Sequence, residues 1–232
     1  MLIEHLQKIH KKQQQKVTDF YTAEGLHVYF KDQMLNDEID VEKVVSRVES
    51  IVPQHLRGEI EMVIIGHFDE FEENHFNAFY KDGMIHVTNN QQDNEDMIED
   101  IVHEIAHSTE EPYGYQLYGD NKIKDEFLRK RHVLHDILWN QGYKAPKSFF
   151  SNTEYDEEFD MFLLKKVGYD KLRQYCSGIF VTTYAPTSLR EYYATGFADF
   201  FLNPDGHDYL RKTSPQLYKK LFELYSEENL DI

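Results

Sequence analysis

Short apolar segments in the first half of the chain predict strands. Residues 26–31 alternate between apolar and polar, and residues 61–66 form the kind of brief apolar run found in buried strands. Residues 78–81 and 84–88 flank Asp82-Gly83, a dipeptide suited to the positive φ angles of a tight hairpin turn. The pattern therefore predicts two strands followed by a hairpin.

Elsewhere, hydrophobic residues recur at helical spacing. This spacing predicts an amphipathic helix over residues 2–20 and another helix over residues 40–52. After Asn89-Asn90, acidic residues and an asparagine at 93–96 precede a new stripe, as expected at the N-terminal end of a helix. The stripe consists of Met97, Ile98, Ile101, Val102 and Ile105. Beyond Gly119-Asp120 nearly the whole chain is predicted to be helical, over residues 122–141, 155–166, 169–176, 187–202 and 214–226.

The order of these elements predicts an α+β protein with two lobes. Residues 1–120 would form an N-terminal α+β lobe that includes the hairpin. Residues 121–232 would form a helical C-terminal lobe. A chain of 232 residues can bury a substantial core, and its content of 41% hydrophobic and 14% aromatic residues is typical of globular proteins.

The net charge narrows the classes of partner. The chain has 42 acidic and 25 basic residues, which gives a formal charge of −17. This charge repels phosphate groups, so we expect neither nucleic acid nor an anionic membrane surface as a partner. Its simplest interpretation is solubility, and a sharper one is a preference for basic protein or peptide substrates.

Cysteine content and the N-terminal residues bear on location. Cys176 is the single cysteine, which excludes an intramolecular disulfide and a cysteine-rich zinc site. The N-terminus lacks the apolar run of a signal peptide, and no segment is apolar for the length of a membrane span. These features predict a cytoplasmic protein, with export that needs no signal as the alternative.

The segment His103-Glu104-Ile105-Ala106-His107 is an H-E-x-x-H motif on a predicted helix. Residues four apart on a helix differ by only about 40° in rotation, so both imidazoles point the same way and can bind one cation. Two imidazoles and one carboxylate suit zinc and leave a position for water. Zinc lowers the pKa of water to about 7, and Glu104 is placed to take a proton from it. The motif predicts a metal-dependent hydrolase.

A third protein ligand is needed, and the best candidate is Glu191, on the first turns of the helix predicted over 187–202. On pattern alone, a solvent-facing glutamate is an equal alternative. His132 and His135 could also bind a metal, but the basic run at 129–131 favours ordinary surface or packing histidines. His86 lies on the predicted edge strand, where it could contact substrate or merely alternate outward, and we expect the latter.

Two motifs together resemble a known family. HEIAH at 103–107 is followed by Tyr184-x-x-Thr187-x-x-x-Glu191-Tyr-Tyr-Ala194-x-Gly-Phe197. This combination resembles the catalytic domain of anthrax lethal factor and related metallopeptidases, which include Pro-Pro endopeptidases. Glu110-Glu111 with Tyr113-Gly114, and the tail from His207 to Leu224, are similar too. The likeness covers roughly residues 95–120 and 180–225.

The resemblance implies a zincin-like fold with a small twisted mixed sheet, an active-site helix beneath it and a helical C-terminal lobe. It implies that Glu191 is the third zinc ligand and that Tyr184 assists catalysis by donating to the carbonyl oxygen, where negative charge develops. Two features depart from the family. The interval between His107 and Glu191 is long, which implies inserted helices over 122–175. Thr195 stands where relatives often have a second acid.

The sequence as a whole predicts a zinc metalloendopeptidase with one Zn²⁺ per chain, held by His103, His107 and Glu191. Glu104 would be the general base, and an extended substrate would lie beside the edge strand near 78–88. One alternative is a regulatory protease specific for a single intracellular partner. A second is a non-catalytic binding or structural protein that zinc only stabilises.

Overall fold

The computed structural model describes residues 19–74 and 76–226, which form two compact units. The first takes in residues up to Ser50 together with Gly58–Ile101, and the second takes in Ile51–Arg57 together with the residues from Val102 onward. The division lies inside one long helix, at residues 101–102, whereas the sequence placed a boundary near residue 120. The HEIAH segment and Glu191 consequently belong to the same unit.

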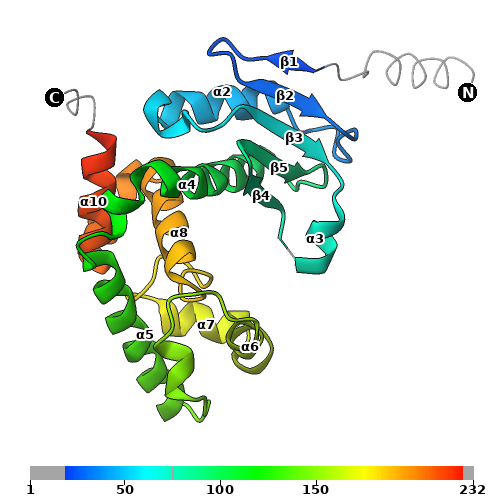
Figure 1. The fold of residues 1–232 in the computed structure, drawn as a ribbon. Coiled ribbons are helices and arrows are strands. Elements are labelled where there is room, and N and C mark those ends of the chain that lie inside the picture. The colour runs from blue at the N-terminus through cyan, green and yellow to red at the C-terminus, as the bar shows by residue number, and fades with distance from the viewer. Residues whose placement is uncertain (1–18, 75, 227–232) are drawn as a thin grey trace, which may run out of the picture. The chain divides into compact units, whose positions relative to one another are not determined.

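The first unit is an α+β arrangement built around one small sheet (Figure 1). Its strands follow the order β1-β2-β3-β5-β4, with β4 at one edge. The elements are β1 (Phe20–Tyr21), β2 (His27–Phe30), α2 (Val41–Ile51), β3 (Met62–Gly66), α3 (Asp69–Asn74), β4 (Ala78–Lys81) and β5 (Met84–Thr88). The helix predicted over 2–20 falls mostly outside the described residues, and its predicted end is wrong because Phe20 belongs to β1.

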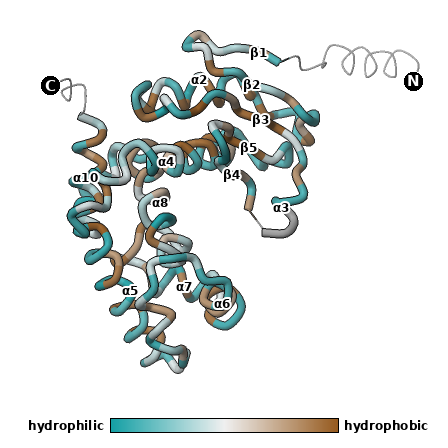
Figure 2. The backbone as a smooth tube through the Cα atoms, viewed as in Figure 1, coloured by the Kyte–Doolittle hydropathy of each residue, from teal (hydrophilic) through white to brown (hydrophobic). Residues whose placement is uncertain are grey.

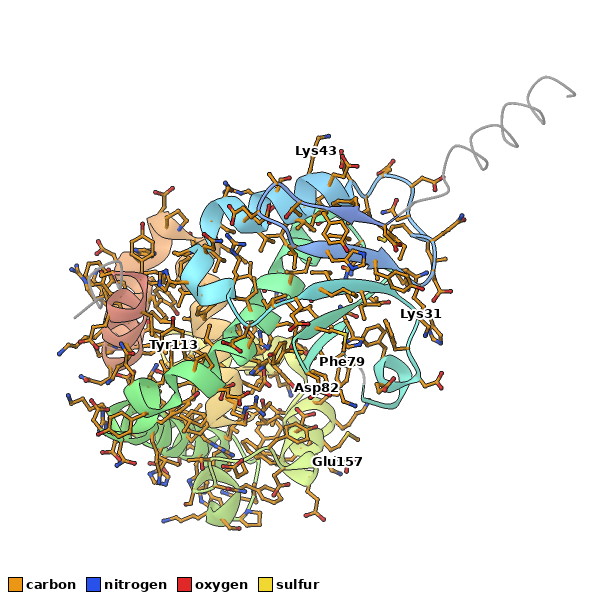
Figure 3. The ribbon with its side chains drawn as sticks, turned by 45° about the horizontal axis from the view of Figure 1, so that its top comes forward. Lys31, Lys43, Phe79, Asp82, Tyr113 and Glu157 are labelled. Atoms are coloured by element: carbon orange, nitrogen blue, oxygen red, sulfur yellow. The ribbon has the colours of Figure 1, made fainter. Side chains whose placement is uncertain are left out.

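The sheet is mixed, as predicted. β2 and β3 are parallel, β3 and β5 are parallel, and the outer strands β1 and β4 pair antiparallel with their neighbours. The β4–β5 hairpin turns at Asp82 and Gly83, whose φ angles are 50° and 79°. Both values are positive, which confirms the hairpin expected from this dipeptide. Asp82 is labelled at the turn in Figure 3, and Phe79 lies on β4.

One face of the sheet supplies much of the core of this unit. Alternate residues of the three central strands are fully buried, namely Val28, Val63, Ile65, Ile85 and Val87. The valine stripe of α2 is buried as well, and Figure 2 shows the hydrophobic colouring along β3. The expectation that His86 points outward is wrong. Its ring is buried and stacks on Phe79 with 4.3 Å between centroids, while the edge of Phe68 contacts it at 5.0 Å.

The second unit is helical (Figure 1). Its α-helices are the C-terminal part of α4 (Asn94–Tyr118), α5 (Lys122–Asn140), α6 (Glu157–Met161), α7 (Tyr169–Cys176), α8 (Leu189–Leu202), α9 (His207–Thr213) and α10 (Pro215–Tyr225). Short 3-10 turns lie at η1 (Gln54–Arg57), η2 (Lys147–Phe150) and η4 (Pro204–Gly206), and a π-helical turn, η3 (Phe162–Val167), continues α6. The helices predicted over 122–141, 169–176, 187–202 and 214–226 are confirmed to within two residues at each end.

A buried carboxylate fixes how three helices of this unit meet. Glu126 of α5 accepts hydrogen bonds from the backbone amides of Gln216 (2.9 Å) and Leu217 (3.1 Å) at the start of α10. It also accepts one from the hydroxyl of Tyr192 in α8 (2.9 Å). The first amides of a helix have no partner within the helix, and its N-terminal end favours negative charge. Glu126 therefore caps α10 and holds α8 beside α5.

Within residues 19–74 and 76–226, no helix combines the length and the apolar character that crossing a bilayer requires.

Candidate metal centre

His103 and His107 lie one turn apart on α4, and their ring centroids are 5.0 Å apart. The residues between and beside them that face the interior, Val102, Ile105 and Ala106, are almost fully buried. The apolar side of α4 thus holds the helix in the core of the unit. Both imidazoles are left partly exposed on the other side, as the spacing of four predicts.

Glu191 lies in the first turn of α8, where the local sequence fixes its backbone. Ser188 is the N-cap residue, and its hydroxyl accepts a hydrogen bond from the Glu191 amide (3.1 Å). Ser-x-x-Glu is the pattern of a capping box, in which the glutamate side chain would return to the N-cap amide. Here the carboxylate of Glu191 is directed at the two histidines instead. The helix start is stabilised by Ser188, which leaves the Glu191 side chain available.

The three side chains converge. His103 Nε2 is 3.0 Å from Glu191 Oε2, and His107 Nε2 is 3.4 Å from Glu191 Oε1. One donor atom from each residue lies within 4.8 Å of the other two. Throughout the described part of the chain, this is the sole group of three or more His, Cys, Asp or Glu side chains close enough to share a metal ion. His132 and His135 are not part of such a group.

The second ring nitrogen of His107 has a carboxylate partner that the sequence did not reveal. His107 Nδ1 lies 2.7 Å from Glu110 Oε1. Glu110 is held in turn by the Nε–H of Arg190, 3.1 Å from both carboxylate oxygens, and by the Tyr118 hydroxyl at 3.3 Å. When Nδ1–H donates to Glu110, Nε2 is the nitrogen that faces Glu191 and that would bind a metal on losing its proton. The spacing of three residues on one helix was the available signal.

The carboxylates and imidazoles of this group shift one another's pKa values. Burial opposes the charged form of His107, but the carboxylates of Glu110 and Glu191 outweigh this effect and raise the pKa of His107 to about 10. Burial likewise favours the neutral acid of Glu191, yet its hydrogen bonds with His103 and His107 hold the Glu191 pKa well below its usual range. The site therefore concentrates negative charge around imidazole nitrogens, which is an environment that favours a bound cation.

Glu104 and Tyr184 belong to the same unit and interact electrostatically with the triad. Glu104 is buried, and its charge acts on both His107 and Tyr184. Tyr184 is 39% exposed and precedes α8, in a turn where its carbonyl accepts hydrogen bonds from the amide and hydroxyl of Thr187. Burial of its phenol, together with the charges of Glu191 and Asp160, raises the pKa of Tyr184. The phenol is therefore a proton-bearing donor at neutral pH.

Thr195 makes its hydrogen bonds to the backbone of its own helix. Its hydroxyl donates to the backbone carbonyl of Glu191 at 2.7 Å, one turn earlier in α8. That bond supports the backbone rather than the carboxylate. The acid that bonds to a histidine of the group is Glu110, which contacts His107 from the same helix.

The donor set fits zinc in its chemistry. Two neutral imidazole nitrogens and one carboxylate oxygen are the protein ligands typical of catalytic zinc, and ligating histidines usually donate their other nitrogen to a carboxylate. His103, His107 and Glu191 would hold the ion, and Glu110 would orient His107. Comparisons of the chain with protein-family models, with curated proteins and with solved structures found no match.

Proposed function

We propose that this chain is a zinc-dependent metalloendopeptidase with a zincin-like fold, related to the catalytic domain of lethal factor. The observation that carries the proposal is the convergence of His103, His107 and Glu191, whose donor atoms lie within 4.8 Å of one another. The two histidines come from α4 and the glutamate from α8. The Glu110–Arg190 contact, between residues 80 apart in sequence, also joins these two helices. Bound at these residues, zinc would polarise both the substrate carbonyl and a water molecule.

Glu104 is the proposed general base. Its side chain is buried, its charge acts on His107, and it occupies the sequence position that an H-E-x-x-H motif gives to the proton acceptor. It would take a proton from the attacking water and deliver it to the amine that leaves. Each peptide bond hydrolysed thus consumes one water, and the carboxylate returns to its ionised form.

Tyr184 is proposed to donate a hydrogen bond to the carbonyl oxygen as negative charge develops there. Tyr184→Phe is expected to retain zinc and to lower kcat roughly 100-fold, the usual scale for losing one such donor. Turnover and zinc content should be measured together. Tyr169→Phe is the matched control, because Tyr169 is an exposed tyrosine on α7 and is not one of the residues assigned to the site. Equal turnover in the two variants would remove Tyr184 from catalysis.

The proposed function can be tested by removing and restoring the metal. The protein, freed of metal with a chelator, should cleave no member of a peptide library, and about one equivalent of zinc should restore cleavage. Mass spectrometry of newly formed N-termini would record each internal cut. If the zinc-loaded protein produced no new termini in a diverse library or in a proteome digest, the peptidase proposal would fail.

The two alternatives make different predictions. A regulatory protease with a single partner would show the same metal dependence but few cut sites in a proteome. A zinc-stabilised structural protein normally holds its ion with four protein ligands. The group described here provides three, and no fourth His, Cys, Asp or Glu among residues 19–74 and 76–226 joins them. This favours an open catalytic site over a closed structural one.

A further inference from the structure

The segment between α5 and α8 is anchored firmly within the second unit. Arg131 of α5 is fully buried, and its guanidinium donates to the carbonyls of Phe149 and Asn152, the latter at 2.5 Å. The same group lies over the ring of Phe159 in α6, 4.2 Å from its centroid. An arginine buried in this way fixes both the 149–152 turn and the start of α6.

This anchored segment is joined directly to the helix that carries Glu191. The backbone amide of Leu189, the first residue of α8, donates to the carbonyl of Thr153 at 2.8 Å. Leu189 precedes Glu191 by two residues. The chain from Thr153 into α6 consequently runs beside the N-terminal end of α8, close to the candidate metal centre.

Two side chains of the segment, Tyr155 and Asp160, bond to each other and interact electrostatically with Glu191. The hydroxyl of Tyr155 donates to Asp160 Oδ2 at 3.2 Å, and the ring of Tyr155 is 53% exposed. The charge of Asp160 interacts with both Glu191 and Tyr184. Within the described residues, Asp160 Oδ1 has no hydrogen-bond or ion-pair partner. Figure 3 labels Glu157 at the start of α6, the helix in which Asp160 lies.

The charges of the site leave Asp160 without a counter-ion. A divalent cation at the triad would be offset by the carboxylates of Glu191 and Glu104. Asp160 is not a member of the triad, so its negative charge would remain uncompensated in a partly buried position. A partly buried carboxylate is stabilised by a cation or by further hydrogen-bond donors. A substrate side chain can supply both.

We propose that Asp160 and Tyr155 form a subsite that selects peptides with an arginine or lysine next to the bond that is cleaved. This inference rests on the proposed peptidase function. The exposed ring of Tyr155 offers a surface for the apolar stem and the cationic group of such a side chain, while Asp160 Oδ1 accepts its N–H. Arginine fits better than lysine, because its planar guanidinium can stack on the tyrosine ring and hydrogen-bond to the carboxylate at the same time.

The experiment uses zinc-loaded full-length protein and a set of peptides that differ only in one residue beside the cleaved bond: arginine, lysine, glutamine or glutamate. Wild type should cleave the arginine and lysine peptides with the highest kcat/KM. Asp160→Asn should lower kcat/KM for these two about 10-fold or more and leave the glutamine peptide unchanged. Asp160→Arg should prefer the glutamate peptide. Glu158→Gln is the control: it removes the charge of an exposed glutamate in the same helix and should behave as wild type.

Binding provides a readout that does not need turnover. In zinc-loaded Glu104→Gln, calorimetry should show tighter binding of the arginine peptide than of the glutamine peptide, and adding Asp160→Asn should remove the difference. Equal binding of both peptides, or an equal loss of kcat/KM for all peptides in Asp160→Asn, would overturn the subsite. Absence of cleavage by wild type, with the binding difference retained, would count against the peptidase function and support the subsite.

Discussion

Glu104→Gln is expected to abolish peptide hydrolysis while zinc content stays near one equivalent per chain. Glutamine keeps the size and hydrogen-bonding reach of the side chain, but its amide cannot take a proton from water. General-base catalysis contributes about 100- to 10,000-fold, so activity should fall by at least this factor. Metal analysis and initial rates on the same preparation separate loss of chemistry from loss of the ion.

Glu99→Gln is the matched control for this variant, since Glu99 lies one turn before His103 on α4 and is exposed. It carries the same change of charge and should leave both activity and zinc content unaltered. Full turnover in Glu104→Gln would end the assignment of the general base. Loss of zinc in that variant would instead show that the buried carboxylate is needed to assemble the site.

Sequence pattern predicted those parts of the fold that short-range rules determine. The β4–β5 hairpin followed from Asp82-Gly83, because only a few dipeptides tolerate two successive positive φ angles. The long helix α5 followed from a sustained apolar stripe. The elements that pattern missed are the short ones, β1, α3 and α9, which have too few residues for a period to emerge.

Long-range contacts account for the errors. His86 was expected to face solvent because side chains alternate along a predicted edge strand, but Phe68, outside the hairpin, packs against its ring. In the sequence, Glu126 resembles any other acidic residue on a helix surface. In the structure it caps a helix that begins about 90 residues later in the chain. Contacts of this kind depend on how helices assemble, and no local period encodes them.

The candidate centre shows the same division. His103, Glu104 and His107 could be placed from spacing alone, because one helix carries them all. Glu191 could not, since Ser188-x-x-Glu191 is equally a capping box whose carboxylate would be occupied locally. Asp160 is one of several acids between residues 154 and 160, and the pattern did not place it near Glu191. Its proximity to Glu191 depends on Arg131 and on the Leu189–Thr153 hydrogen bond.

His107→Ala is expected to lose most of its zinc, and Glu110→Gln to lose an intermediate amount. The first change removes one of three protein donors, while the second leaves all three and removes only the carboxylate that orients His107. Loss of such an orienting partner lowers metal affinity about 10- to 100-fold. Competition titration with a zinc-binding dye would rank the variants as wild type, Glu110→Gln and His107→Ala, in order of falling affinity.

His132→Ala tests whether this ranking is specific to the triad, because His132 is an exposed histidine on α5 that belongs to no metal-binding group of the described chain. It should bind zinc as wild type does. Circular dichroism of each variant without metal should match that of the wild-type protein, since Ile105 and Ala106 hold α4 in place and are unchanged. If His107→Ala kept one full equivalent of zinc at unchanged affinity, the ion would be bound elsewhere. The roles assigned to Glu191 and Glu110 would then also be wrong.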